Sequence, residues 1–297
     1  ALPIFQLIMC VITTMQMLDV PYMYASGGPS GASTTQGIFI YNAFHQDLNY
    51  VACFNLKPEL AHYGGLSIIE LLSNCAKLPE FSEKVPFSDI KLEAPIPRPR
   101  RNIFCAGKNY LDHVREVAKS GLGSGPTSGS EAPTAPIIFT KVPESVIATG
   151  ESILRHAGLT DQLDYEAELA VIIGHVGRNI RREDAMDHVW GYTIINDVSA
   201  RDLQKRHQQW HLAKSLDTFC PMGPWMVSKD ELNATDAIIK CWVNSELRQD
   251  ASTSQFIFDI PELIATISAG ITLYPGDIIA TGTPSGVGMG FKPPKFL

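Results

Sequence analysis

One strand-like segment carries carboxylates inside an otherwise apolar run, and this combination limits the possible folds more than any other feature. In residues 163–174, the β-branched residues and the closing Gly174 predict a β-strand with side chains on two alternating faces. Asp164, Glu166 and Glu168 are then expected on one face. Buried carboxylates are costly without a partner, and a hard divalent cation removes that cost. An edge strand with a wet acidic face is the alternative.

A further carboxylate stands at the end of another strand-like run. The aromatic and β-branched residues 189–195 lead into Asn196 and Asp197, and Arg201 then opens a short helical turn. One Asp and two Glu that leave positions open for water and substrate suit Mg²⁺ or Mn²⁺ better than Zn²⁺, which prefers nitrogen and sulfur ligands. Arg201 and Gln204 lie three residues apart on one helical face, where they can bind an anionic ligand.

Two other segments carry polar side chains that are suited to catalysis or ligand binding. In residues 109–116, His113 and Glu116 are i, i+3 neighbours on a helix, where the carboxylate orients the imidazole and raises its basicity. The Gly- and Ser-rich run 121–130 follows, so we expect a mobile lid; a surface His–Glu pair is the alternative. Lys214 is a lone cation beside an apolar turn, and a solvated surface lysine is its alternative.

Five stretches of the chain resemble the fumarylacetoacetate hydrolase family, in the order and at the spacing of that family. They extend over roughly residues 100 to 297 and comprise residues 106–113, 164–169, 191–204, 214–217 and 281–284. Each motif is weak alone, whereas five in order are highly specific. The resemblance implies an α+β, mainly β fold: a mixed β-sheet roll with short helices and a small N-terminal domain. Members are usually dimeric and hold one Mg²⁺ or Mn²⁺.

The resemblance also implies a role for individual side chains. The metal ligands that it implies are Glu166, Glu168 and Asp197. The catalytic residues are His113 and Glu116, an acid/base pair on a lid from about Tyr110 to Ala135 that orders when ligand binds, and Lys214, which stabilises a substrate carboxylate or oxyanion. The substrate-binding residues are Arg201, Gln204 and Thr283.

A metal site and an acid/base pair predict chemistry through an enolate. We expect a metal-dependent hydrolase that cleaves a C–C bond in a diketo acid of the acylpyruvate or fumarylpyruvate type. An oxaloacetate-type 2-keto acid decarboxylase or isomerase on the same site is the alternative, because the fold does not choose between these reactions. A catalytically inactive metal-binding scaffold is an alternative of another class. The glycine-rich run 286–290 departs from the dinucleotide fingerprint, and Pro293 follows where a helix would continue.

Amino-acid composition and charge limit the possible binding partners and cellular compartment of the protein. The chain has 45% hydrophobic and 19% charged residues and a net charge of −7 without a basic stripe, so we expect no nucleic-acid partner. Its six cysteines show no CxxC or Cys/His spacing, which favours reduced thiols. Residues 1–18 are uncharged, but they lack a basic n-region and are too polar for a membrane-spanning helix. We expect a cytoplasmic homodimer that binds a small anionic keto acid and no membrane, with a mitochondrial or other targeting segment as the alternative.

Three segments are predicted along the chain. Residues 1–37 form a divergent N-terminal extension, and residues 38–99 form a small N-terminal domain that ends in a proline-rich linker. Residues 100–297 form the catalytic domain. Family members usually continue past the position of Leu297 with a further strand pair, so a truncated C-terminal end is also expected.

Overall fold

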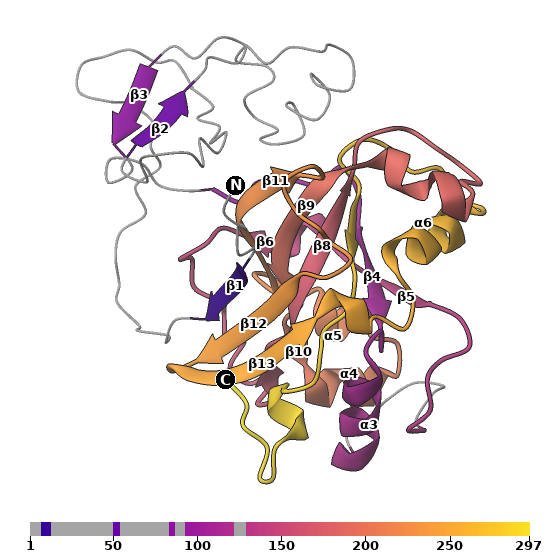
Figure 1. The fold of residues 1–297 in the computed structure, drawn as a ribbon. Helices are drawn as coiled ribbons and strands as arrows, with labels where there is room; N and C mark the ends of the chain where they lie inside the picture. The colour runs from indigo at the N-terminus through magenta and orange to yellow at the C-terminus, as the bar shows by residue number, and fades with distance from the viewer. Residues whose placement is uncertain (1–6, 13–49, 54–82, 87–92, 122–128) are drawn as a thin grey trace.

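A curled, mixed β-sheet of seven strands forms the centre of the molecule. The structure, a computed structural model, describes residues 7–12, 50–53, 83–86, 93–121 and 129–297, the first three ranges by their backbone only (Figure 1). The sheet has the order β5-β4-β14-β8-β9-β11-β6. These strands are β4 (Ile103–Gly107), β5 (Ile137–Lys141), β6 (Val146–Ile147), β8 (Ala167–Ile173), β9 (Val189–Asn196), β11 (Cys220–Ser228) and β14 (Ile278–Ala280). Strand β14 is parallel to β4 and antiparallel to β8, so the predicted mixed, mainly β fold is confirmed.

Smaller sheets flank this centre. Strands β12 (Ile238–Val243) and β13 (Glu246–Ser252) are antiparallel, and β1 (Leu7–Ile12) pairs with β12 in parallel. Strands β7 (Leu163–Asp164) and β10 (Ser199–Ala200) form a short antiparallel pair. Strands β2 (Tyr50–Cys53) and β3 (Glu83–Pro86) form another, and together with residues 93–99 they are the described part of the predicted small N-terminal domain. The rest of that domain, and most of the predicted extension, lie outside the described residues.

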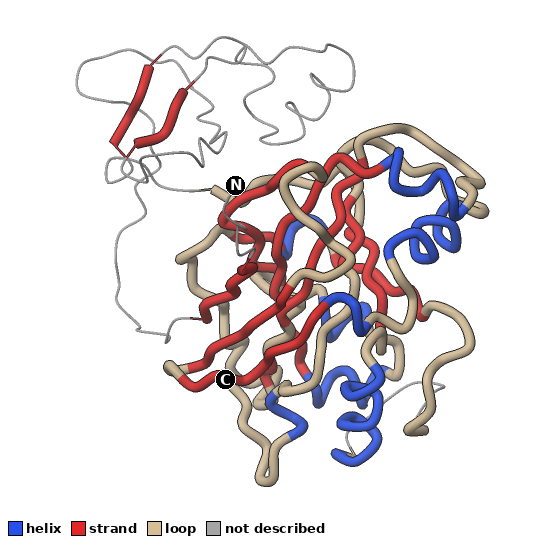
Figure 2. The backbone as a smooth tube through the Cα atoms, in the orientation of Figure 1, coloured by secondary structure: helices blue, strands red, loops and turns tan. Residues whose placement is uncertain are grey.

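Short helices surround the strands (Figure 2). They are α3 (Leu111–Ser120), α4 (Arg201–His207), α5 (His211–Lys214) and α6 (Ile260–Ser268), with 3-10 turns η2 (Pro143–Ser145), η3 (Arg182–His188), η4 (Thr253–Gln255) and η5 (Gly288–Gly290). Helix α3 ends where Gly121 takes a φ of 69°, which glycine adopts without steric cost. Helix α6 begins where the Asp259 side chain accepts a hydrogen bond from the Glu262 N–H. Among the described helices, none has the length and apolar character to cross a membrane.

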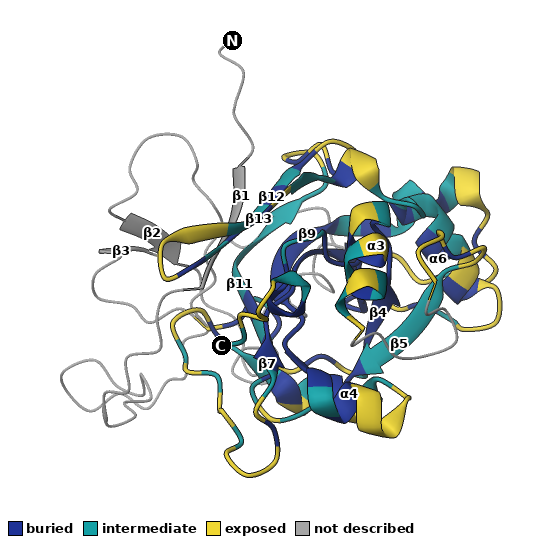
Figure 3. Cartoon of the chain, turned by 90° about the horizontal axis from the view of Figure 1, so that it is seen from below, coloured by how far each residue is buried: buried dark blue, intermediate teal, exposed yellow. Residues whose placement is uncertain are grey.

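Strand β8 lies inside the sheet, between β14 and β9, and every one of its residues is buried. The expected alternation holds: Leu169, Val171 and Ile173 pack into one hydrophobic cluster, and Ala170 and Ile172 into another on the opposite face. Figure 3 shows these central strands as buried, with exposed surface on the outer sides of α3 and α4. The alternative of an edge strand with a wet acidic face is therefore wrong.

The predicted single strand over residues 163–174 is interrupted. Strand β7 ends at Asp164, β8 begins at Ala167, and Tyr165 and Glu166 lie between them. Strand β9 ends at Asn196, as expected, and pairs antiparallel with β8 so that Ala167 faces Asn196. This register brings Glu166 and Glu168 beside the first residue after β9, which is Asp197.

Candidate active site

Three buried carboxylates meet where β8 and β9 pair. One ligand atom of Glu166, Glu168 and Asp197 each lies within 4.8 Å of the others. The Asp197 N–H donates to the Glu166 carbonyl at 2.8 Å, and the Asn196 side-chain oxygen accepts from the Glu166 N–H at 2.9 Å. Oxygen ligands of one divalent cation stand about 2.0–2.6 Å from it, so their mutual separation fits a single ion. The triad predicted from the sequence is thus assembled in space.

Three cationic side chains bind two of the three carboxylates, Glu166 and Asp197. Lys214 Nζ donates to Glu166 Oε2 at 2.6 Å and to Asp197 Oδ2 at 2.7 Å. Lys141 Nζ donates to the other Asp197 oxygen at 2.7 Å and to the Lys214 carbonyl. Arg201 Nη2 lies 2.7 Å from Glu166 Oε1 in an ion pair, although its N–H directions satisfy no hydrogen bond. Lys214 is 2% exposed, so the alternative of a solvated surface lysine is wrong.

Burial and charge act differently on the two glutamates. Burial raises the pKa of Glu166, but the Lys214 and Arg201 charges outweigh it and hold that pKa below its ordinary value. Burial and the Asp197 and Glu166 carboxylates raise the pKa of Glu168 well above its ordinary value. Glu168 Oε2 accepts from the Gly282 N–H at 2.8 Å, which only partly offsets that repulsion. A divalent cation among these oxygens would relieve the repulsion at Glu168.

Asp164 does not join the triad, which corrects the expectation that it shares a face with Glu166 and Glu168. Because the strand is interrupted after Asp164, its carboxylate points elsewhere. Its two oxygens accept from the N–H groups of Gly288 and Met289 at 2.7 and 3.0 Å and from Arg201 Nε at 2.9 Å. Asp164 therefore orients Arg201 and anchors η5.

His113 and Glu116 lie on α3, on another wall of the pocket. His113 Nδ1 is 3.2 Å from Glu116 Oε2, and the second Glu116 oxygen accepts from the Gly286 N–H at 2.9 Å. With Nδ1–H donating to the carboxylate, His113 Nε2 is left as the basic nitrogen. A Cβ at Gly290 would lie 2.1 Å from Glu116 Oε1, so glycine is required for this close approach. The glycine-rich run 286–290 thus packs against the acid/base pair.

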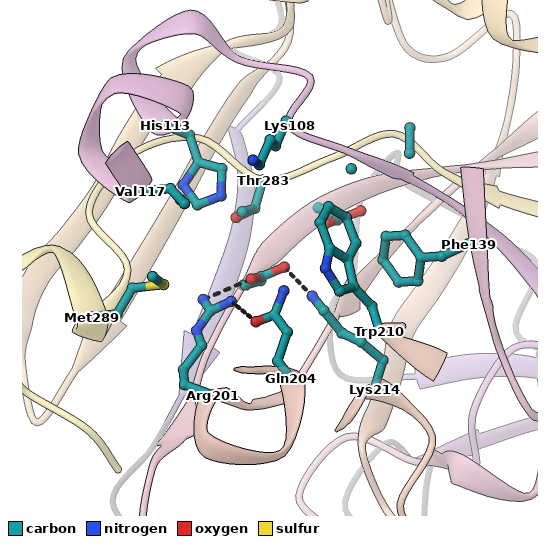
Figure 4. A pocket seen from close by; sticks show the side chains of 14 residues that line it. Lys108, His113, Val117, Phe139, Arg201, Gln204, Trp210, Lys214, Thr283 and Met289 are labelled. Carbon is teal, nitrogen blue, oxygen red and sulfur yellow. Dashed lines mark hydrogen bonds and ion pairs between the residues drawn. The ribbon is translucent and has the colours of Figure 1, made fainter. Parts of the chain in front are cut away.

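One pocket unites these groups (Figure 4). Its lining includes seven residues predicted from the sequence, namely His113, Glu166, Glu168, Arg201, Gln204, Lys214 and Thr283. Asp197 and Glu116 are not among its lining residues; Asp197 contacts Lys214, and Glu116 contacts His113. The empty space of the pocket, which opens to solvent at its mouth, is about 430 Å³.

Two predicted substrate contacts already have protein partners. Gln204 Oε1 accepts from Arg201 Nη1 at 3.1 Å. The Thr283 hydroxyl donates to the Ala167 carbonyl at 3.0 Å and accepts from Gln249 Nε2 at 2.8 Å. Their contact with substrate stays a prediction.

Sequence reasoning missed three residues of the site. Lys141 is fully buried at the end of β5, and a lysine closing the apolar run 137–141 was the available signal. Trp210 and Lys108 line the pocket. Trp210 precedes α5 without any local pattern that would reveal it, whereas Lys108 lies inside the recognised stretch 106–113 without having been assigned a role.

The chain is similar to several known proteins. Oxaloacetate tautomerase YisK of Bacillus subtilis is 55% identical over 213 residues, 71% of this chain and 67% of that protein. The solved fumarylacetoacetate hydrolase from psychrophilic Exiguobacterium antarcticum is 41% identical with a TM-score of 0.69, over 85% of this chain and 86% of that one. The 2-hydroxyhepta-2,4-diene-1,7-dioate isomerase from Mycobacterium marinum is 33% identical with a TM-score of 0.62, over 80% and 78%.

The family comparison covers the part of the chain that builds the pocket. The fumarylacetoacetate hydrolase C-terminal family matches residues 102–297, which contain the acidic triad, the three cations and helix α3. The buried triad is consistent with the divalent-metal site typical of that family. This chain is therefore an enzyme of the fumarylacetoacetate hydrolase family.

Proposed function

We propose that this protein is a divalent-metal-dependent tautomerase that interconverts the keto and enol forms of an oxaloacetate-type 2-keto acid. The observation that carries the proposal is one pocket lined by Glu166, Glu168 and His113, with Asp197 next to the two glutamates and Glu116 paired with His113. A keto–enol conversion needs only these two elements. It requires charge stabilisation at an oxygen and a base beside the neighbouring carbon.

Glu166, Glu168 and Asp197 are the proposed metal ligands. Their donors are oxygen only, and three carboxylates leave coordination positions for water and substrate, which favours Mg²⁺ or Mn²⁺. When bound, the cation would act as a Lewis acid that stabilises negative charge on the keto oxygen. Lys141 and Lys214 fix both Asp197 oxygens, so the ligand set is preorganised.

His113 is the proposed base. Its Nε2 would take a proton from C3, the electron pair of the broken C3–H bond would become the C2–C3 double bond, and the C2=O π pair would move onto the oxygen. That oxygen would take a proton from solvent to give the enol, and His113 would release its proton to solvent. The reverse direction returns the proton to C3. Glu116 holds the imidazole through Nδ1 and is itself fixed by the Gly286 N–H, so the ring keeps its orientation during the transfer.

The cationic side of the pocket suits the keto-acid end of the substrate. Arg201 has a buried Nη2 without a hydrogen-bond partner, next to Glu166 on the triad. A substrate carboxylate near the triad would accept a charge-assisted hydrogen bond from this nitrogen beside its ion pair with Glu166. Lys214, in contact with two triad members, would stabilise developing oxyanion charge.

Tautomerisation is better supported than the expected hydrolysis. The relative with 55% identity is named an oxaloacetate tautomerase, and the Mycobacterium marinum structure is named an isomerase. Hydrolysis of a diketo acid would also need a water positioned at a second carbonyl. Decarboxylation of the same keto acid uses the same enolate and remains the competing reaction to be measured. The homodimer stays a prediction.

The test is a comparison of three reactions with one enzyme preparation in Mg²⁺ or Mn²⁺. Enol absorbance of oxaloacetate reports tautomerisation, pyruvate formation reports decarboxylation, and loss of acylpyruvate reports hydrolysis. We expect metal-dependent acceleration of tautomerisation far above the other two. Hydrolysis or decarboxylation as the fastest reaction would overturn the proposal. The Glu168→Gln variant serves as the inactive reference, and Glu144→Gln, an exposed glutamate outside the pocket, as the matched control.

A further inference from the structure

We infer that Lys108 forms a binding subsite for the second carboxylate of the substrate and so selects short dicarboxylic keto acids over keto acids with an uncharged tail. This inference rests on the proposed tautomerase function, because it assumes that the keto-acid end of the substrate lies at the triad. It adds a residue and a specificity that the metal site and the acid/base pair do not provide.

Lys108 faces the triad from the opposite side to the other cations. In Figure 4, Lys108 enters the pocket beside His113 and Thr283, and Arg201 and Lys214 enter from the other side of the carboxylates. All of these residues line the same pocket. A substrate whose keto-acid end lies at the triad and Arg201 would therefore extend its tail toward Lys108.

The backbone around Lys108 is turned and firmly held. Lys108 has a φ of 56°, in the left-handed region that non-glycine residues rarely occupy, and the strain of such a conformation often accompanies a functional role. The next residue, Asn109, is fully buried, and its amide group donates to the Phe258 and Thr281 carbonyls at 2.9 and 2.7 Å. Its own carbonyl accepts from the Ile257 N–H at 2.8 Å. These contacts fix the direction in which the lysine side chain leaves the chain.

The residue before Lys108 is held equally closely. A Cβ at Gly107 would lie 2.2 Å from the Trp210 ring, so the indole packs directly on the backbone at this point. Trp210 also stacks edge-to-face with Phe139 at 5.2 Å, and both rings line the pocket. Lys108 is thus placed between a packed aromatic wall and a clamped asparagine, which preorganises its position.

Charge and burial make Lys108 suited to a carboxylate. The residue is only 6% exposed, and burial lowers its pKa. A carboxylate beside a desolvated lysine favours its charged form, so each partner stabilises the other. Arg201 and Lys214 are ion-paired with carboxylates of the protein on the triad side of the pocket, where the keto-acid end of the substrate is proposed to lie.

The experiment compares oxaloacetate with its 4-methyl ester, which keeps the keto-acid end but loses the second charge. Tautomerisation kcat/KM and Mg²⁺-dependent binding by thermal shift are measured for both compounds. The variants are Lys108→Met and Lys108→Arg, with Lys119→Met as the control because Lys119 is an exposed lysine outside the pocket. A rise in Tm with Mg²⁺ alone shows that each variant is folded and keeps its metal site.

We expect the wild-type enzyme and Lys119→Met to prefer the diacid over the ester by about 10- to 100-fold, the range for a hydrogen bond between charged groups. In Lys108→Met, this preference should fall to about one, mainly through loss of diacid binding, and Lys108→Arg should keep most of it. An unchanged preference in Lys108→Met, or no preference in the wild type, would overturn the subsite. If the wild type binds the diacid preferentially and Lys108→Met does not, while neither compound is tautomerised, the subsite stands and the proposed function fails.

Discussion

Two parts of the pocket are held in place by different contacts: its floor, formed by the triad Glu166, Glu168 and Asp197, and one wall, formed by His113 and Glu116. On the floor, ion pairs of 2.6–2.7 Å tie Glu166 and Asp197 to Lys141, Lys214 and Arg201, between side chains that are at most 5% exposed, and Glu168 accepts from the Gly282 N–H. On the wall, His113 has a 3.2 Å contact with Glu116, which is 15% exposed and accepts from the backbone N–H of Gly286 in a glycine-rich turn. Changes on the floor should therefore alter metal binding and stability, and changes on the wall should alter rate alone.

The largest effect is expected from neutralising a floor carboxylate. Glu168→Gln should abolish both the Mg²⁺-dependent rise in Tm and Mg²⁺-dependent turnover, because it removes one of three ligands and the charge that attracts the cation. Thermal melts and turnover with increasing Mg²⁺ measure this, with Glu144→Gln as the reference. A Glu168→Gln protein with wild-type Mg²⁺ stabilisation would show that the triad is not the metal site.

A large but purely kinetic effect is expected on the wall. His113→Ala and Glu116→Ala should each lower kcat by about 10²–10⁴, and the double variant should lose little more, because the pair acts as one unit. Mg²⁺-dependent stabilisation should persist in all three. Steady-state kinetics on oxaloacetate measure the rates, and additive losses in the double variant would contradict the paired mechanism.

Lys141→Met should lower the free energy of unfolding, an effect that we expect for changes on the floor and not for changes on the wall. Lys141 is fully buried and bonds Asp197 Oδ1, so its removal leaves a buried carboxylate with one cation less. Removing one partner of a buried ion pair costs about 3–5 kcal/mol of the free energy of unfolding. Because Lys214 still contacts Asp197, we expect a loss at the lower end, about 3 kcal/mol. Urea unfolding measures the loss. Lys119→Met, at an exposed site, should change the free energy of unfolding by less than about 0.5 kcal/mol.

The smallest effect is expected at Gly290. An added Cβ would meet the Glu116 carboxylate at 2.1 Å, so Gly290→Ala should push Glu116 away from His113 and lower kcat about 10-fold without altering the response to Mg²⁺. Gly270→Ala is the matched control, because nothing lies within 4 Å of a Cβ there. Equal kinetics for Gly290→Ala and Gly270→Ala would show that the turn η5 does not position Glu116.

The sequence predicted the floor better than the wall for a physical reason. Carboxylates within apolar strand residues are conspicuous because their burial needs compensation, so Glu168 and Asp197 could be found from pattern alone. The alternation failed at Asp164, because local periodicity does not reveal that the strand stops and resumes at Ala167. Lys141 was missed because its partner, Asp197, lies far along the chain, directly after β9.

The wall depends on contacts between distant segments, which one sequence does not display. The His113–Glu116 spacing indicated a pair, and the helix over 111–120 agrees with it. The role of Gly286 and Gly290 in holding Glu116 became visible only once the turn was seen against α3. Residues 122–128 of the predicted lid lie outside the described residues, so ordering of the lid on ligand binding stays a prediction.

The most direct test is the rate of oxaloacetate tautomerisation as a function of Mg²⁺ concentration, because one curve gives both the half-saturating metal concentration and the maximal rate. The account predicts an unchanged half-saturating concentration with a maximal rate lowered by about 10²–10⁴ for His113→Ala. It predicts no Mg²⁺-dependent rate for Glu168→Gln. A Glu168→Gln curve like that of the wild type, or a His113→Ala curve shifted in Mg²⁺ concentration with its maximal rate intact, would contradict the account.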